Sequence, residues 1–244
     1  MKLEYDRSSI SSNKDYNTPP KYIEVVRDFI GGRISLDPCS NKFSMVDAET
    51  EWILPENDGL QKDWKCFNSI FVNPPYGKDR ERGTSIRDWC KKCAETSFMN
   101  CAAHIFLLIP VATNTRHWKD SIFPWAQDIC FLSDTRVKFW ENGEVNKKGS
   151  PMPCCIVHYG GKSRGVSFSQ KFCKIGNCVH LENQHGDSIN KYETLNWFSN
   201  QVKIEIPSSG ELLKILNSGD AKSNDTVDAI AYSCEQNNER KEDE

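Results

Sequence analysis

Long apolar segments are missing from this chain of 244 residues. No run approaches the roughly 18 apolar residues needed to cross a bilayer, and Met1 to Ile10 lacks the apolar core of a secretory signal peptide. We therefore expect a protein that has no membrane partner and stays inside the cell that makes it. Its compartment would be the cytoplasm for a phage or bacterial source, and the nucleus if the source is eukaryotic.

An excess of positive charge is missing too. The formal net charge is -3, whereas nucleic-acid-binding domains are usually basic as a whole. Any contact with DNA must then come from a local patch. The stretch 77–92 is one candidate, with six basic residues against three acidic ones. By charge alone, such a stretch is as often a solvated loop and helix face.

The cysteines do not form the pattern of a disulfide framework. There are 11, an odd number, and no secretory signal accompanies them, so we expect mostly free, half-buried thiols. Two sets have zinc-like spacing: Cys90, Cys93, Cys101 and His104, and Cys173, Cys178, His180 and His185. The first set fits the apolar face of a helix and strand. The second lies in a stretch without a core pattern and stays open, and we assign no metal site.

Buried strands alternate with amphipathic helices along the chain. Apolar runs predict strands at 34–36, 69–72, 105–109 and 129–132. Helical spacing predicts helices from Thr18, as the cap, to Ile30 and from Ser85 to Ser97, and a helical connection over 113–125. This order predicts a doubly wound α/β fold with a mostly parallel sheet. The segments 137–140 and 154–159 flank a polar stretch and predict a long antiparallel hairpin at one edge.

One domain with appendages fits the length of the chain. We expect a flexible N-terminal arm at 1–15, a main domain at 16–217 and a flexible acidic tail at 218–244. Within the main domain, 161–205 has no clear pattern and is either an appended recognition region or a zinc-stapled one, and 208–217 predicts a short helix.

Three predicted strands end in segments with the side chains of a binding site, at 37–41, 73–76 and 110–114. The carboxyl ends of parallel strands meet at one edge of a sheet, and ligands of open α/β sheets bind there. The competing interpretation is that proline and asparagine simply end these strands.

The tetrapeptide Asn73-Pro74-Pro75-Tyr76 favours a site. Two consecutive prolines fix the backbone and leave carbonyl groups without a ladder partner. The side-chain oxygen of Asn73 and the carbonyl of Pro74 are then rigid acceptors for the two N–H bonds of an exocyclic amine, a poor nucleophile that such contacts make more tetrahedral. Tyr76 offers a face for a planar base, a contact of about 1 to 3 kcal/mol.

This tetrapeptide at the end of a buried strand is the signature of amino-methyltransferases that act on adenine N6, cytosine N4 or protein glutamine. Over 16–160 the chain resembles the phage-type Dam family of DNA N6-adenine methyltransferases, whose motifs it carries in order: Tyr16-Asn17-Thr18-Pro19-Pro20, Leu36-Asp37-Pro38-Cys39-Ser40, Asp58-Gly59-Leu60 with Trp64, the tetrapeptide, 108–115 and Pro151-Met152-Pro153. The resemblance implies a Rossmann-like methyltransferase fold that binds S-adenosylmethionine.

The resemblance also implies roles for single residues. The catalytic residues would be Asn73, Pro74, Pro75 and Tyr76, and those that bind S-adenosylmethionine would be Thr18, Pro19, Asp37, Pro38, Cys39, Ser40 and Asp58. Asp37 would bind the amino group of the methionine moiety, and Asp58 would reach the adenosine end. The usual glycine-rich turn is replaced here by Cys39-Ser40-Asn41. Several other acidic residues compete with Asp58 for the ribose.

The implied reaction is direct transfer of the sulfonium methyl group to an adenine flipped out of the duplex, with no covalent enzyme intermediate. Cys39 and Cys66 are therefore interpreted as packing residues rather than nucleophiles. DNA would contact Lys78, Arg80, Arg82, Arg87, Arg116, Arg136 and Lys138. The alternatives are methylation of cytosine N4 or of a protein glutamine, and a non-catalytic nucleic-acid-binding protein that retains the fold. Asn73 favours adenine, because cytosine enzymes more often have serine there.

Overall fold

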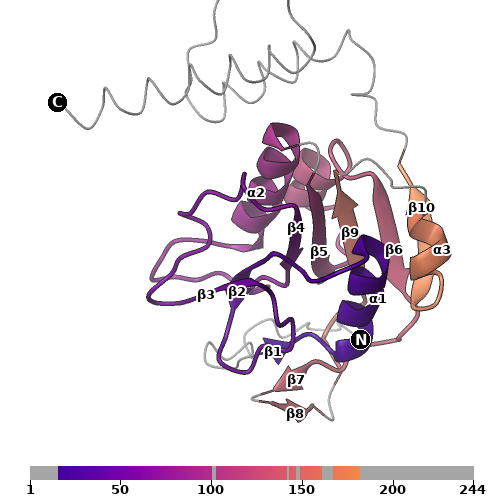
Figure 1. Cartoon of the computed structure of the whole chain (residues 1–244), viewed down its shortest axis with the longest axis horizontal. Helices are drawn as coiled ribbons and strands as arrows, with labels where there is room; N and C mark the ends of the chain where they lie inside the picture. The colour runs from indigo at the N-terminus through magenta and orange to yellow at the C-terminus, as the bar shows by residue number, and fades with distance from the viewer. Residues whose placement is uncertain (1–15, 101–102, 142, 147–148, 161–166, 182–244) are drawn as a thin grey trace, which may run out of the picture. The chain divides into compact units, whose positions relative to one another are not determined.

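Seven strands form one mixed sheet in the order β10-β6-β9-β5-β4-β2-β3 (Figure 1). The strands are β2 (Leu36–Ser40), β3 (Thr50–Ile53), β4 (Ser69–Val72), β5 (His104–Pro110), β6 (Asp128–Leu132), β9 (Cys154–Tyr159) and β10 (Gly176–His180). The pairs β3-β2, β2-β4 and β4-β5 are parallel, whereas β9 is antiparallel to both β5 and β6, and β10 is antiparallel to β6. Strands β2 to β6 therefore all run in one direction, while β9 and β10 run the other way, which confirms an α/β fold but makes the sheet mixed, with as many antiparallel pairings as parallel ones.

The predicted edge hairpin is wrong. Strand β9 lies inside the sheet between β5 and β6, and the segment expected to pair with it contributes instead to a separate small sheet. That sheet consists of β1 (Tyr16–Asn17), β7 (Trp140–Glu141) and β8 (Glu144–Val145). All six residues of β9 are buried, and a strand without exposed alternate positions belongs in a sheet interior covered on both faces.

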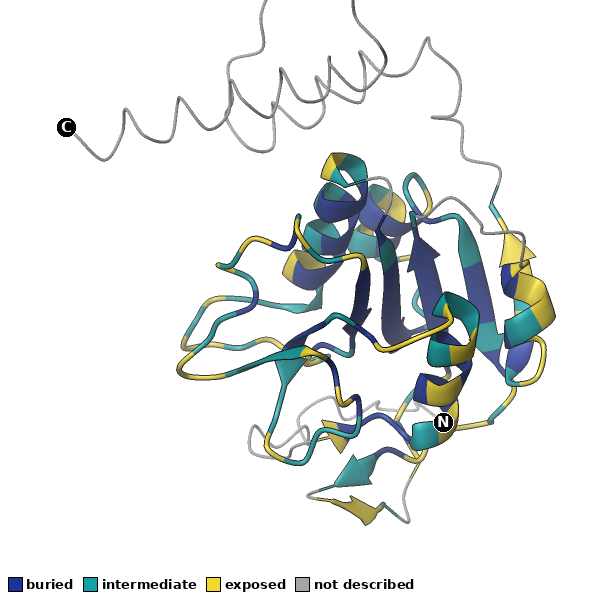
Figure 2. Ribbon diagram, viewed as in Figure 1, coloured by how far each residue is buried: buried dark blue, intermediate teal, exposed yellow. Residues whose placement is uncertain are grey.

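Helices cover both faces of the large sheet. Helices α1 (Pro20–Ile30) and α3 (Phe168–Phe172) pack on one face, and α2 (Ile86–Met99) with the single wide turn η1 (Trp118–Ile122) packs on the other. Strand β5 shows the alternation, with Ile105 and Leu107 in the core under α2 and Phe106 and Leu108 in the core under α1. Strands β4 and β9 are accordingly buried over their whole length, and β5 is buried at every residue after His104 (Figure 2).

The helix ends follow local chemistry, with one difference from expectation. Helix α1 begins at Pro20 with Pro19 in the cap position, so Thr18 is not the cap, and its side chain makes no capping hydrogen bond. The helix ends at Gly31, which has φ of 69° and donates its N–H to Arg27 O at 2.9 Å, a left-handed end that glycine adopts without strain. Helix α2 starts as predicted, after Ser85 in a capping box with Asp88.

Two predicted connections take other forms. The segment expected as a turn after a strand at 34–36 is itself strand β2, with a register irregularity between Asp37 and Ser40 around Pro38, which has no N–H to donate. The helical connection expected over 113–125 is reduced to η1.

The structure, a computed structural model, describes residues 16–100, 103–141, 143–146, 149–160 and 167–181. All of these fall in the first of two compact units, Met1–Asn183. The predicted arm at 1–15, the helix at 208–217 and the tail at 218–244 lie outside the described residues. Within the described residues, no helix combines the length and the apolar character that crossing a bilayer requires.

Candidate active site

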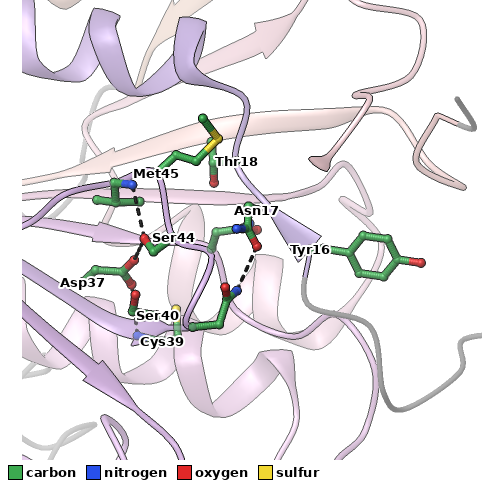
Figure 3. Close-up of a pocket in the computed structure, with 11 residues that line it drawn as sticks. Tyr16, Asn17, Thr18, Asp37, Cys39, Ser40, Ser44 and Met45 are labelled. Carbon is green, nitrogen blue, oxygen red and sulfur yellow. Dashed lines mark hydrogen bonds between the residues drawn. The ribbon is translucent and has the colours of Figure 1, made fainter. Parts of the chain in front are cut away.

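The carboxyl ends of β2 and β4 meet in a small pocket (Figure 3). Its lining includes five residues singled out in the sequence: Thr18, Asp37, Cys39, Ser40 and Asn73. Six further lining residues were not singled out: Tyr16, Asn17, Asn41, Ser44, Met45 and Val46. Strand β5 also ends at this edge, but 110–114 does not line the pocket. Two of the three predicted segments therefore converge on one cavity.

Asp37 is a buried carboxylate without a cation. Its side chain is 5% exposed, its Oδ1 accepts the backbone N–H of Cys39 at 3.1 Å, and its Oδ2 lies 3.5 Å from the Ser44 hydroxyl. Burial raises its pKa to about 7, against the lowering effect of the Cys39 N–H, and Glu51 raises it further. Among the described residues, no positively charged side chain pairs with it. A positively charged ligand group beside Asp37 would offset the free-energy cost of burying its ionised carboxyl group.

Two hydroxyl groups at the same pocket also lack partners. Thr18 Oγ1 and Ser40 Oγ are buried and make no hydrogen bond in the described part of the chain. Such groups are rare in folded proteins, because each forfeits its hydrogen bonds to water. Together with Asp37 they provide one anionic group and two neutral polar ones on one cavity wall. That set fits a ligand with a cationic group beside polar atoms that form hydrogen bonds.

Two asparagines of the pocket lining form a hydrogen-bond network with Phe43. Asn41 donates from Nδ2 to Asn17 Oδ1 at 2.9 Å, Asn17 donates to the carbonyl of Phe43, and the backbone N–H of Phe43 donates to Asn41 Oδ1 at 2.8 Å. The Tyr16 ring points away from this network (Figure 3). The hydroxyl oxygen of Ser44 accepts a hydrogen bond from the backbone N–H of Val46 at 3.2 Å. In the sequence, Tyr16 and Asn17 belonged to a family motif and Asn41 to the segment 37–41, whereas Ser44 and Val46 gave no signal.

Asn73 follows β4 directly and joins the two strand ends. Its backbone N–H contacts the thiol of Cys39, whose pKa burial raises well above its usual value, so this cysteine stays a neutral packing group, as expected. Cys66 is exposed, so its interpretation as a packing residue is wrong. Of the two prolines, Pro74 is buried and Pro75 is exposed. Asn73 itself is half-buried and faces the pocket.

Tyr76 is held at its hydroxyl end. The hydroxyl donates to the Leu108 carbonyl at 3.3 Å, and the ring packs edge to face on Phe139 with 6.0 Å between centroids. Phe139 in turn packs on Tyr16 at 6.4 Å. The residue is half-buried. Its ring is therefore fixed before any substrate arrives.

The turn at Asp58-Gly59 packs directly on β2. A β-carbon on Gly59 would lie 2.0 Å from the carbonyl oxygen of Pro38, so only glycine permits this approach. The buried indole N–H of Trp64 donates to the Gly59 carbonyl at 2.8 Å and locks the turn. Asp58, Pro19 and Pro38 do not line the pocket. Pro19 and Pro38 are next in sequence to lining residues, and Asp58 is next to Gly59, which packs on β2.

The predicted DNA-contacting residues fall into two groups. Five are exposed, with no ion pair to another described residue: Lys78, Arg80, Arg116, Arg136 and Lys138. Arg87 forms a half-exposed ion pair with Asp120 at 3.5 Å. Arg82 is largely buried between Asp58 and Asp79. Neither pairing was predicted from the sequence.

The zinc-like sets are not assembled as metal sites in the described residues. Cys90 and Cys93 are residues of α2 and are buried in the core between this helix and the sheet. His104 Nδ1 lies 3.1 Å from His158 Nε2. His180 Nδ1 lies 2.9 Å from Asp128 Oδ1. Cys101 and His185 are outside the described residues. The cysteines that the structure describes are free thiols.

Comparison with known families gives a match over most of the described residues. The family model described as DNA N-6-adenine-methyltransferase (Dam) matches residues 8–160, which is more than half of the chain and spans β1 to β9. No match to a curated protein was found.

Proposed function

Because the chain belongs to the Dam family of DNA N-6-adenine-methyltransferases, we propose that it transfers the methyl group of S-adenosylmethionine to N6 of an adenine flipped out of DNA. Membership makes it a DNA adenine N6-methyltransferase. The observation that carries the finer proposal is the pocket beside Asn73, where, among the described residues, the buried Asp37 carboxylate has no cationic partner and two hydroxyls have no hydrogen-bond partner.

These groups fit the methionine end of the methyl donor. Asp37 would bind its ammonium group, and the hydroxyls of Thr18 and Ser40 would donate to its carboxylate, which gives each unpartnered group a partner. When bound, S-adenosylmethionine supplies a methyl group on a cationic sulfur. Pro19, Pro38 and Cys39 would shape this end of the pocket, and Asp58 would reach the adenosine.

Asn73 and Pro74 are proposed to activate the amino group. The side-chain oxygen of Asn73 and the carbonyl of Pro74 would accept its two N–H bonds, which draws the nitrogen lone pair out of conjugation with the ring. N6 then forms a bond to the methyl carbon as the sulfur–carbon bond breaks, and N6 loses one proton to solvent. Because Pro74 and Pro75 fix these acceptors in advance, no free energy is needed to reorient them during the reaction.

Tyr76 is proposed to hold the flipped base. Its ring is fixed by Leu108 O and by Phe139, so a base that stacks on it orders few other groups. The exposed basic residues Lys78, Arg80, Arg116, Arg136 and Lys138 are proposed to hold the phosphate backbone, together with Arg87. Since the chain as a whole is acidic, these local contacts must supply the electrostatic attraction to DNA.

The direct test is incubation with labelled S-adenosylmethionine and unmethylated DNA, followed by nucleoside analysis. We expect label in N6-methyladenine, and its loss by about 10² to 10³ fold in Asn73→Ala. Asn68→Ala is the matched control, because Asn68 is exposed and lies at the opposite end of β4. Label in N4-methylcytosine, or equal activity of Asn73→Ala and the parent, would contradict the proposal.

A further inference from the structure

The guanidinium of Arg82 links two carboxylates. Its Nε donates to Asp79 Oδ2 at 2.8 Å, and its Nη1 lies 3.2 Å from Asp58 Oδ1. The side chains of Arg82 and Asp58 are only 22% and 23% exposed. An arginine that contacts phosphate is normally free to reach outward, whereas this one is directed back into the protein.

On one side, the arginine belongs to a closed loop. Asp79 N donates to Thr84 O at 2.8 Å, and Asp79 Oδ1 accepts the backbone N–H groups of Glu81 and Arg82, both at 3.0 Å. Gly83, with φ of 68°, completes the turn. This loop begins three residues after Tyr76, so its position and that of the base-binding tetrapeptide are linked through a short, constrained segment.

On the other side, Arg82 fixes a carboxylate next to the donor strand. Asp58 Oδ1 accepts the Leu60 N–H at 3.0 Å and faces Arg82, which leaves Oδ2 without a partner among the described residues. The following residue, Gly59, is pressed on the Pro38 carbonyl. The hydrogen bond from the Leu60 N–H and the ion pair with Arg82 together orient Asp58, and Gly59 sets its place relative to β2.

The charges favour this arrangement. Burial acts to lower the pKa of Arg82, but Asp79 and Asp58 raise it, so the guanidinium remains charged. The Arg82 backbone and side-chain N–H groups lower the pKa of Asp79, which remains ionised. One cation between two carboxylates leaves the cluster with a net negative charge.

We propose that Arg82 is a positioning residue that orients Asp58 toward the adenosine moiety of the methyl donor and couples donor binding to the loop after Tyr76. The inference rests on the proposed function, because it takes Asp58 as a donor-binding residue. Free Oδ2 accepts a ribose hydroxyl, while Arg82 keeps Oδ1 in place. Arg82 thus serves the donor site rather than the DNA backbone.

The test compares Arg82→Gln with Arg80→Gln, its matched control. Both remove one positive charge from the same loop, but Arg80 is exposed and outside the Asp58 contact. We expect Arg82→Gln to raise the Kd of S-adenosylmethionine about tenfold, measured by calorimetry without DNA. Arg80→Gln should leave that Kd within about twofold and weaken only DNA binding. Arg82→Lys keeps the charge but cannot reach both carboxylates, so it should also raise the donor Kd.

Coupling is measured with Asp58→Asn and the double variant. Residues that act as one unit are non-additive, so the effect of Arg82→Gln on donor Kd should largely disappear in an Asp58→Asn background. Additive effects, or a parent-like donor Kd in both Arg82→Gln and Arg82→Lys, would overturn the inference. If the parent protein itself fails to bind S-adenosylmethionine, the proposed function fails instead.

Discussion

Gly59 and Pro38 lie so close that a single added carbon would collide with backbone, since a β-carbon on Gly59 falls 2.0 Å from Pro38 O. This contact joins the turn that carries Asp58 to the strand that carries Asp37. The two ends of the proposed donor site are therefore held at a fixed separation by backbone rather than by side chains.

Gly59→Ala should separate this turn from β2. We expect a loss of about 1 to 3 kcal/mol in the free energy of unfolding, together with weaker donor binding. Gly32→Ala is the control, because a β-carbon on Gly32 meets nothing within 4 Å. Denaturant melts of both variants give the comparison. Equal stability of the two would show that Pro38 moves aside easily.

Asp37→Asn should stabilise the protein without ligand. The folded-state pKa of Asp37 is raised to about 7, so ionisation at higher pH destabilises the fold relative to the unfolded chain. The penalty grows as pH rises from about 4 to 7 and is complete above pH 7, at roughly 2 to 4 kcal/mol. Asn retains an acceptor for the Cys39 N–H. Thermal melts at pH 8 should show a higher Tm for Asp37→Asn, and a lower one would contradict this account.

Donor binding should weaken as pH falls through 7. The ammonium of S-adenosylmethionine requires ionised Asp37, so its Kd should rise about tenfold for each pH unit below the pKa of about 7. Calorimetric titrations from pH 5.5 to 8.5 measure the dependence. Methylthioadenosine, which lacks the amino-acid moiety, is the control ligand, and its Kd should stay constant. A pH-independent Kd for the full donor would exclude Asp37 as its partner.

Removing the ring of Tyr76 should weaken binding of the flipped base. Tyr76→Ala loses stacking of about 1 to 3 kcal/mol, so kcat/KM for DNA should fall by roughly 5- to 150-fold while donor Kd is unchanged. Tyr76→Phe keeps the ring and loses the hydroxyl contacts with Leu108 O and the Cys154 thiol, so it should retain activity to within severalfold. Steady-state kinetics on a duplex substrate separate the two. Comparable losses in both variants would assign the effect to the hydroxyl.

The sequence predicted the parts of the fold that depend on local pattern. The apolar runs that became β4, β5 and β6 and the helix after Ser85 were found because their burial leaves a period in the sequence. The position of β9 was not found. A fully buried strand fits any interior place in a sheet, and the neighbours of β9 are separated from it by many residues.

Pocket-lining residues were predicted correctly where family motifs coincide with the predicted ends of strands. Thr18, Asp37, Cys39, Ser40 and Asn73 share one pocket as expected. The pairing of Arg82 with Asp58 was missed, since charge counting treats every arginine in a basic stretch as equally available. Salt bridges between distant segments leave no period in a sequence, so only the folded chain shows which charges are already paired.

The central place of β9 has a consequence for how the chain is made. Strands β5 and β6 meet only through β9, although they leave the ribosome well before it. Until residue 159 has emerged, each has a long apolar strand edge open to other chains. Truncations that end before residue 154 should therefore aggregate even though they contain Asp37, Asn73 and Tyr76. We therefore expect β9 to decide whether β5 and β6 remain in solution during synthesis.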